Sequence, residues 1–148
     1  MTKIKLFTMK KSLLFLLFSF LAACNADNFN NSNPYLNNVN FSKDINTSLP
    51  AYNGLNYPSN PVLITDVGVG VQGIIVMKTG GGESYIAWEA SCPNQSPTSC
   101  SRLSISGINA VCSCDSFSYS LYTGDGGQEY PLKQYRVEVS GAIIRVYN

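Results

Sequence analysis

Short stretches of alternating apolar and polar residues, separated by Gly, Pro, Asn and Ser, make up the sequence from Val39 onward. Alternation with a period of two is typical of strands that have one buried face. No stretch in this part repeats its apolar residues at the spacing of an amphipathic helix. The sequence therefore predicts an all-β domain over residues 39–148, with short antiparallel strands forming a small sandwich or barrel.

Two hairpins can be placed within this domain. Residues 71–78 and 84–90 flank a glycine-rich stretch, and residues 135–139 and 142–146 are joined by a tight Ser-Gly turn. The stretch 116–122 alternates serines with aromatic and aliphatic residues, so we expect one buried face there.

The letters of residues 68–73, GVGVQG, match the G-x-G-x-x-G pattern of dinucleotide sites. Such a site requires a helix directly after the glycines, because the N-terminus of that helix holds the pyrophosphate. A strand and a turn follow here instead. We therefore predict no nucleotide cofactor.

The N-terminus has the features of an export signal: four lysines precede an apolar run of about a dozen residues. The run ends in Leu-Ala-Ala-Cys24, which resembles the lipobox of bacterial lipoproteins. The resemblance implies a signal peptide over residues 1–23, lipidation of Cys24 and anchoring of the protein to a membrane through the lipid. An ordinary signal peptide that ends near a cysteine is the alternative. Asn25, in place of Asp, fits that family's rule for transport to the outer rather than the inner membrane of the cell envelope.

Residues 24–38 are rich in asparagine and lack apolar periodicity, which predicts a flexible tether. All nine acidic residues follow Cys24, together with six of the ten Lys and Arg residues, so the part after the signal has a net charge of −3. A mildly acidic surface does not favour nucleic-acid binding, which needs a basic face.

Four cysteines remain after Cys24: Cys92, Cys100, Cys112 and Cys114. In an exported protein an even number of cysteines predicts disulfides, here two. Four cysteines allow three pairings. A bond between Cys112 and Cys114 would close a very small strained ring, so the pairing that contains it is disfavoured and two pairings stay open.

The two cysteine clusters, "SCPNQSPTSC" and "VCSCDSFSYSLYTG", followed by "YPLKQYRVEV", resemble a Rieske iron–sulphur domain over about residues 69–146. By this resemblance Cys92 and Cys112 match the two cysteine ligands of the cluster. Asn94 and Asp115 stand where the two histidine ligands would be. The chain has no histidine at all, so a conventional Rieske centre, with its two imidazoles on one iron, is excluded.

The resemblance also implies the disulfide pairing. Cys100 and Cys114 match an extra pair that some Rieske domains use to link their two loops. Cys92 and Cys112, which would share one iron in those domains, are then left to bond to each other. The alternatives are a [2Fe-2S] cluster held by unconventional ligands, such as all four cysteines, and an unrelated exported β-domain with two disulfides.

The first hypothesis for function is a non-catalytic, lipid-anchored binding or structural module of the cell envelope, with no metal and no cofactor and with an envelope protein as partner. Tyr119, Tyr122 and Tyr130 are candidates for a recognition surface. The second hypothesis is an electron-transfer protein with an unconventional [2Fe-2S] cluster. A third, an enzyme that acts through carboxylates, would use Asp115, Asp125 and Glu129.

Overall fold

The computed structural model describes residues 32–148, and this part of the chain contains nine strands in two sheets. The strands are β1 (Ser42–Asn46), β2 (Val62–Ile64), β3 (Ile74–Lys78), β4 (Tyr85–Glu89), β5 (Leu103–Ser106), β6 (Asn109–Cys112), β7 (Ser118–Ser120), β8 (Gln134–Ser140) and β9 (Ile143–Tyr147). The larger sheet has the order β1-β9-β8-β4-β3-β2 and the smaller one β5-β6-β7. Neighbouring strands in both sheets are antiparallel. The prediction of an all-β, antiparallel fold is confirmed.

The predicted signal peptide, the lipidation site at Cys24 and the first part of the predicted tether lie outside the described residues. Within residues 32–148 no helix is long and apolar enough to cross a membrane.

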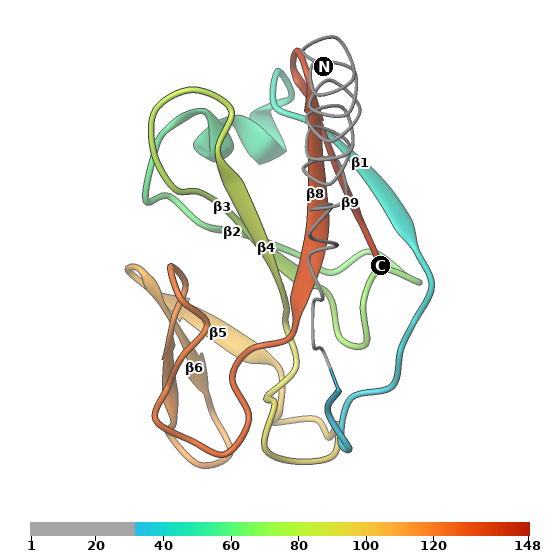
Figure 1. Ribbon diagram of the computed structural model, residues 1–148, viewed down its shortest axis with the longest axis vertical. Coiled ribbons are helices and arrows are strands. Elements are labelled where there is room, and N and C mark those ends of the chain that lie inside the picture. Colours follow the sequence, from blue (N-terminus) through green and yellow to red (C-terminus); the bar gives the residue numbers. More distant parts are fainter. Residues whose placement is uncertain (1–31) are drawn as a thin grey trace, which may run out of the picture. The chain divides into compact units, whose positions relative to one another are not determined.

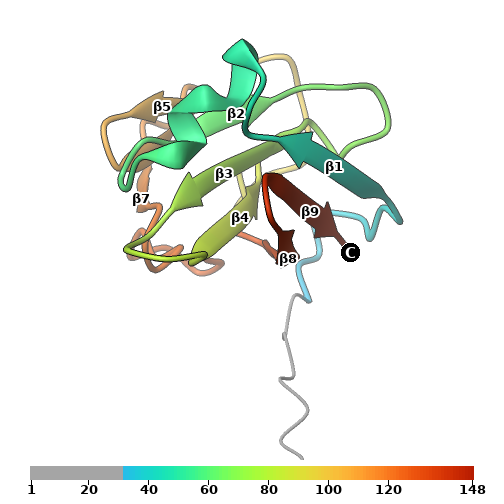
Figure 2. The same ribbon diagram turned by 90° about the horizontal axis from the view of Figure 1, so that it is seen from above.

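Strand β3 is buried on both faces and separates two apolar clusters. Ile75 and Met77 point into the first cluster, and Ile74 and Val76 point into the second. All four side chains are 0% exposed, which explains why this strand is an unbroken apolar run rather than an alternating one. Figures 1 and 2 show β5–β7 on one side of β3 and β4, and β1, β8 and β9 on the other.

Both predicted hairpins are present. Strands β3 and β4 pair from Lys78 opposite Tyr85, and β8 and β9 pair from Ser140 opposite Ile143. Gly141 in the second turn has φ +59°, a conformation that favours glycine.

The 3-10 helix η2 (Pro50–Asn56) was not predicted from the sequence, and neither were strands β1, β2, β5 and β6. Proline at its start suits a first turn, and Leu55 is buried in the second apolar cluster.

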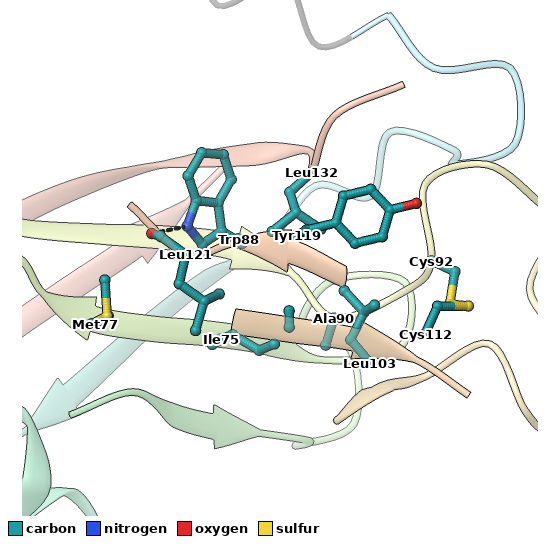
Figure 3. Packing of buried hydrophobic residues seen from close by; sticks show 11 residues of the cluster. Ile75, Met77, Trp88, Ala90, Cys92, Leu103, Cys112, Tyr119, Leu121 and Leu132 are labelled. Atoms are coloured by element: carbon teal, nitrogen blue, oxygen red, sulfur yellow. Dashed lines mark hydrogen bonds between the residues drawn. A yellow bond between two sulfur atoms is a disulfide. The ribbon is translucent and has the colours of Figure 1, made fainter. Parts of the chain in front are cut away.

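Trp88 lies in the first apolar cluster, which Figure 3 shows from close by. The indole nitrogen donates a hydrogen bond of 2.8 Å to the carbonyl of Leu121. Gly124 lies against the ring: a Cβ at this position would be 2.6 Å from Cη2 of Trp88. The turn after β7 therefore needs a glycine here to close over the tryptophan.

Residues 33–38, the end of the predicted tether, are packed against the β-domain, and we call them the N-terminal strap. Leu36 is only 3% exposed. Asn33 donates a hydrogen bond of 2.8 Å to the carbonyl of Pro93, and the rings of Tyr35 and Tyr130 meet edge to face.

A buried lysine also holds the strap. The ammonium group of Lys133, which is 2% exposed, donates to the carbonyl of residue 37 and to the side chain of residue 38. The domain thus begins before Val39, the boundary that the sequence analysis gave.

Candidate functional site

Two loops carry the four cysteines and meet at the end of the first apolar cluster. The first loop, residues 92–101, follows β4, and the second, residues 112–117, connects β6 to β7. Disulfides join Cys92 to Cys112 and Cys100 to Cys114, with Cα–Cα distances of 5.7 and 5.3 Å. This is the pairing that the resemblance to Rieske domains implied. Both bonds connect the same two loops.

The bond between Cys92 and Cys112 is the inner one and forms part of the core. The two residues are 1% and 0% exposed, and Figure 3 shows them at the end of the cluster beside Leu103. The side-chain amide of Gln95 donates a hydrogen bond of 3.0 Å to Sγ of Cys112.

Asn94, at the position of the first histidine ligand, uses its whole amide in contacts within the protein. Its Nδ2 donates to the hydroxyl of Tyr119 at 2.9 Å and to the carbonyl of Tyr130 at 2.8 Å. Its Oδ1 accepts a hydrogen bond of 2.9 Å from the backbone N–H of Tyr130. Burial, the largest effect, raises the pKa of Tyr119, and the hydrogen bond that Asn94 donates to the phenol oxygen lowers it by less. The side chain thus ties the first loop to β7 and to the loop before β8.

Asp115, at the position of the second histidine ligand, is exposed and shapes the turn in which it lies. Its Oδ1 accepts a hydrogen bond of 3.0 Å from the backbone N–H of Phe117, two residues on. Ser116 between them has φ +63°, and the backbone N–H of Cys112 donates to the carbonyl of Phe117. An aspartate stabilises such a turn because its short carboxylate reaches the N–H two residues ahead.

The other carboxylates and tyrosines named from the sequence do not gather into one site. Asp125 is exposed and accepts from the backbone N–H of Gly127 at 3.0 Å, and Glu129 is exposed. In the described part of the chain, no three His, Cys, Asp or Glu side chains lie close enough together to hold a metal ion.

Tyr119 is fully buried, so it is not part of a recognition surface. Tyr122 is 38% exposed, and its hydroxyl is hydrogen bonded to Ser59 at 2.5 Å.

The glycine-rich loop over residues 68–73 binds a carboxylate of the protein itself. Glu89, at the end of β4, is 0% exposed. Its Oε2 accepts from the N–H of Val71 at 2.7 Å, and its Oε1 accepts from the N–H groups of Gln72 and Ser91, both at 3.0 Å. A Cβ on Gly70, which has φ +66°, would lie 2.8 Å from Oε2 of Glu89. The glycine lets the backbone approach the carboxylate.

The hydroxyl of Tyr135 on β8 completes this network with a hydrogen bond of 2.6 Å to Oε2 of Glu89. Burial, followed by the charge of Glu89, raises the pKa of Tyr135 well above its ordinary value. Glu89 was not among the residues predicted from the sequence to belong to a site. A signal was available, because a lone glutamate stands in an otherwise apolar strand, where a buried charge requires partners.

No protein-family model matches the chain. A search of curated proteins also finds no match. Among solved structures, the chain is similar to one in the complex of reduced oxygenase and oxidised ferredoxin of carbazole 1,9a-dioxygenase, with 18% identity and a TM-score of 0.46 over 75% of this chain and 94% of the other. It is also similar to the plasma membrane Rieske protein of the cyanobacterium Synechocystis PCC 6803, with 19% identity and a TM-score of 0.46 over 60% of this chain and 86% of that one.

A third similar structure is the ferredoxin of carbazole 1,9a-dioxygenase from Nocardioides aromaticivorans. It shares 19% identity at a TM-score of 0.43, over 63% of this chain and 90% of the ferredoxin. Similarities at this level assign no function.

Proposed function

We propose that this chain is a lipid-anchored protein of the cell envelope whose Rieske-like domain holds no iron–sulphur cluster. It acts as a non-catalytic binding or structural module. The observation that carries the proposal is the state of the four positions that would ligate a cluster: two are bonded to each other and two are engaged in other contacts.

The two cysteines come first. Iron binding requires thiolates, and Cys92 and Cys112 have none to offer while they form a disulfide. Both are buried in the apolar cluster, so the bond is part of the packing that supports the loops. A loop of about 20 residues closed in this way stabilises a domain by roughly 3 kcal/mol in the chain-entropy model.

The two replaced histidines come second. Asn94 provides a neutral amide whose nitrogen and oxygen are both hydrogen bonded to tyrosines. Asp115 provides a hard oxygen ligand that is exposed and hydrogen bonded to a backbone N–H. Neither supplies the imidazole nitrogen that the Rieske cluster takes from histidine. The residues at these positions do not fit the cluster.

Iron and acid-labile sulphide analysis of the purified full-length chain tests this proposal. We expect a colourless protein without stoichiometric iron or sulphide, whether it is isolated in air or without oxygen. Stoichiometric iron and sulphide with visible absorption would instead support the electron-transfer alternative. The double variant Cys92→Ser, Cys112→Ser is the matched control, because iron held at the proposed ligand positions would be lost in it and adventitious iron would remain.

A separate experiment tests the anchor. Cys24→Ser should abolish acylation and release the protein from membranes, and mass spectrometry of the N-terminal peptide measures the acyl chains directly. Acyl chains on the variant would contradict lipidation at Cys24. Asn25 supports an outer-membrane destination, which fractionation of the two membranes tests.

A further inference from the structure

The second disulfide, Cys100–Cys114, differs from the first in its exposure. Cys100 is exposed and Cys114 is half-buried, whereas the inner pair is at most 1% exposed. A disulfide reacts with a thiolate only if the attacking sulphur can reach it. The outer bond is therefore open to exchange in the folded protein, and the inner bond is not.

The two loops do not depend on the outer bond to stay together. The inner disulfide joins the same two loops at their core-facing ends, eight residues before Cys100 in the first loop and two residues before Cys114 in the second. The first loop is also held by Ser101, which is 0% exposed and whose hydroxyl accepts from the N–H of Thr98 at 2.7 Å and donates to Oε1 of Gln72 at 2.9 Å. Opening the outer bond therefore leaves both loops in place.

A hydroxyl group lies beside both sulphurs of the outer bond. Oγ1 of Thr98 is 3.4 Å from Sγ of Cys100 and 3.7 Å from Sγ of Cys114. When a disulfide opens, one sulphur leaves as a thiolate, and a hydrogen bond to the charged form stabilises it. Thr98 is placed to donate that hydrogen bond.

We propose that Cys100–Cys114 is a thiol–disulfide exchange site that accepts two electrons from a dithiol. A thiolate of the dithiol attacks Sγ of Cys100, the more exposed residue of the pair. The bond between the two cysteines breaks, and Cys114 leaves as a thiolate that accepts the hydrogen bond from Thr98. The second thiolate of the dithiol then attacks the mixed disulfide and releases Cys100. The dithiol is oxidised to a disulfide, and its two protons pass to Cys100 and Cys114. This inference does not depend on the proposed function.

Stepwise reduction of the oxidised full-length chain with dithiothreitol under native conditions tests the proposal. At intervals the remaining reductant is removed, free thiols are alkylated, and peptide mapping with fragmentation locates the label. We expect Cys100 and Cys114 to be labelled more than about tenfold faster than Cys92 and Cys112, since the inner pair needs a local opening of the structure. The aromatic bands of the near-UV circular dichroism spectrum should stay unchanged while only the outer pair is reduced.

Variants at neighbouring positions distinguish an exchange site assisted by Thr98 from a disulfide that is merely exposed. Thr98→Val keeps the shape of the side chain and removes the donor, so exchange should slow by about tenfold, the effect of one hydrogen bond to a charged group. Ser99→Ala, at an exposed neighbour, should leave the rate unchanged. Reduction of both bonds together, reduction of the inner bond first, or equal rates for the two variants would overturn the proposal.

Discussion

Replacing Glu89 by glutamine should remove a large share of the domain's stability. Each carboxylate oxygen accepts two hydrogen bonds: Oε2 from Val71 N–H and the Tyr135 hydroxyl, and Oε1 from Gln72 N–H and Ser91 N–H. A glutamine keeps one oxygen and turns the other into an N–H₂ group. If the new nitrogen stands at the place of Oε1, the N–H groups of Gln72 and Ser91 both face a third donor. If it stands at the place of Oε2, the N–H of Val71 does, whereas the hydroxyl of Tyr135 can turn and accept.

The magnitude follows from the lost acceptor. A buried donor without a partner costs about 1–3 kcal/mol, and one or two donors lose their acceptor here. We therefore expect Glu89→Gln to lower the free energy of unfolding by about 2–4 kcal/mol, against a total of about 5–15 kcal/mol for a typical domain. Urea denaturation followed by the fluorescence of Trp88, the single tryptophan of the chain, measures the change with the disulfides kept oxidised.

The matched control is Glu83→Gln, because Glu83 is exposed in the turn between β3 and β4. That variant should stay within about 0.5 kcal/mol of the parent protein. A loss in Glu89→Gln within about 1 kcal/mol of this control, at an unchanged slope of unfolding free energy with urea, would refute the account of the buried network.

Because the pKa of Tyr135 is raised in the folded state, the unfolded state loses the phenol proton at a lower pH, and the free energy of unfolding falls as the pH rises above about 10. Tyr135→Phe should remove the part of this alkaline loss that comes from Tyr135, which a series of urea denaturations at increasing pH measures. Gly124→Ala should lower the free energy of unfolding by about 2–4 kcal/mol and shift the emission of Trp88, because the strain of a positive φ adds to overpacking against the indole ring. The control Gly107→Ala, at φ +60° with open space around it, should lower it by only about 1 kcal/mol, and equal losses in the two variants would contradict the account. Leu36→Ala should lower the free energy of unfolding by about 2–3 kcal/mol, and an unchanged melting curve would show that the N-terminal strap contributes no packing.

The strands that could be predicted from the sequence are those in which the order of apolar and polar residues matches the buried and exposed faces of the strand. The two hairpins have turn glycines and clear apolar residues, and Tyr119 and Leu121 alternate with serines toward the core, as expected for residues 116–122. Strands β1, β2, β5 and β6 were not located, because strands of three to five residues are stabilised by pairing with their neighbours more than by local propensity.

The candidate site was predictable in its covalent part and not in its hydrogen bonds. The cysteine spacing and the resemblance led to two loops joined by two disulfides. The roles of Asn94 and Asp115 depend on partners that lie 25 and 2 residues away, and only the second of these is a local turn pattern. Residues 33–38 were predicted to be part of a flexible tether because they are rich in asparagine. Their contacts with the domain depend on one buried leucine and one asparagine that donates to the first loop, and two such residues produce no apolar periodicity.

The N-terminal strap determines how a pulling force would enter the domain. Asn33 and Lys133 fasten it to the first cysteine loop and to the start of β8. Tension applied at the N-terminal end would therefore load these hydrogen bonds before it reached β1. Once they broke, the first loop could not be drawn away from the second, because two covalent bonds hold the pair. Such a chain should yield in two mechanical steps, with release of the strap at low force and detachment of β1 from β9, its neighbour in the larger sheet, at a higher force.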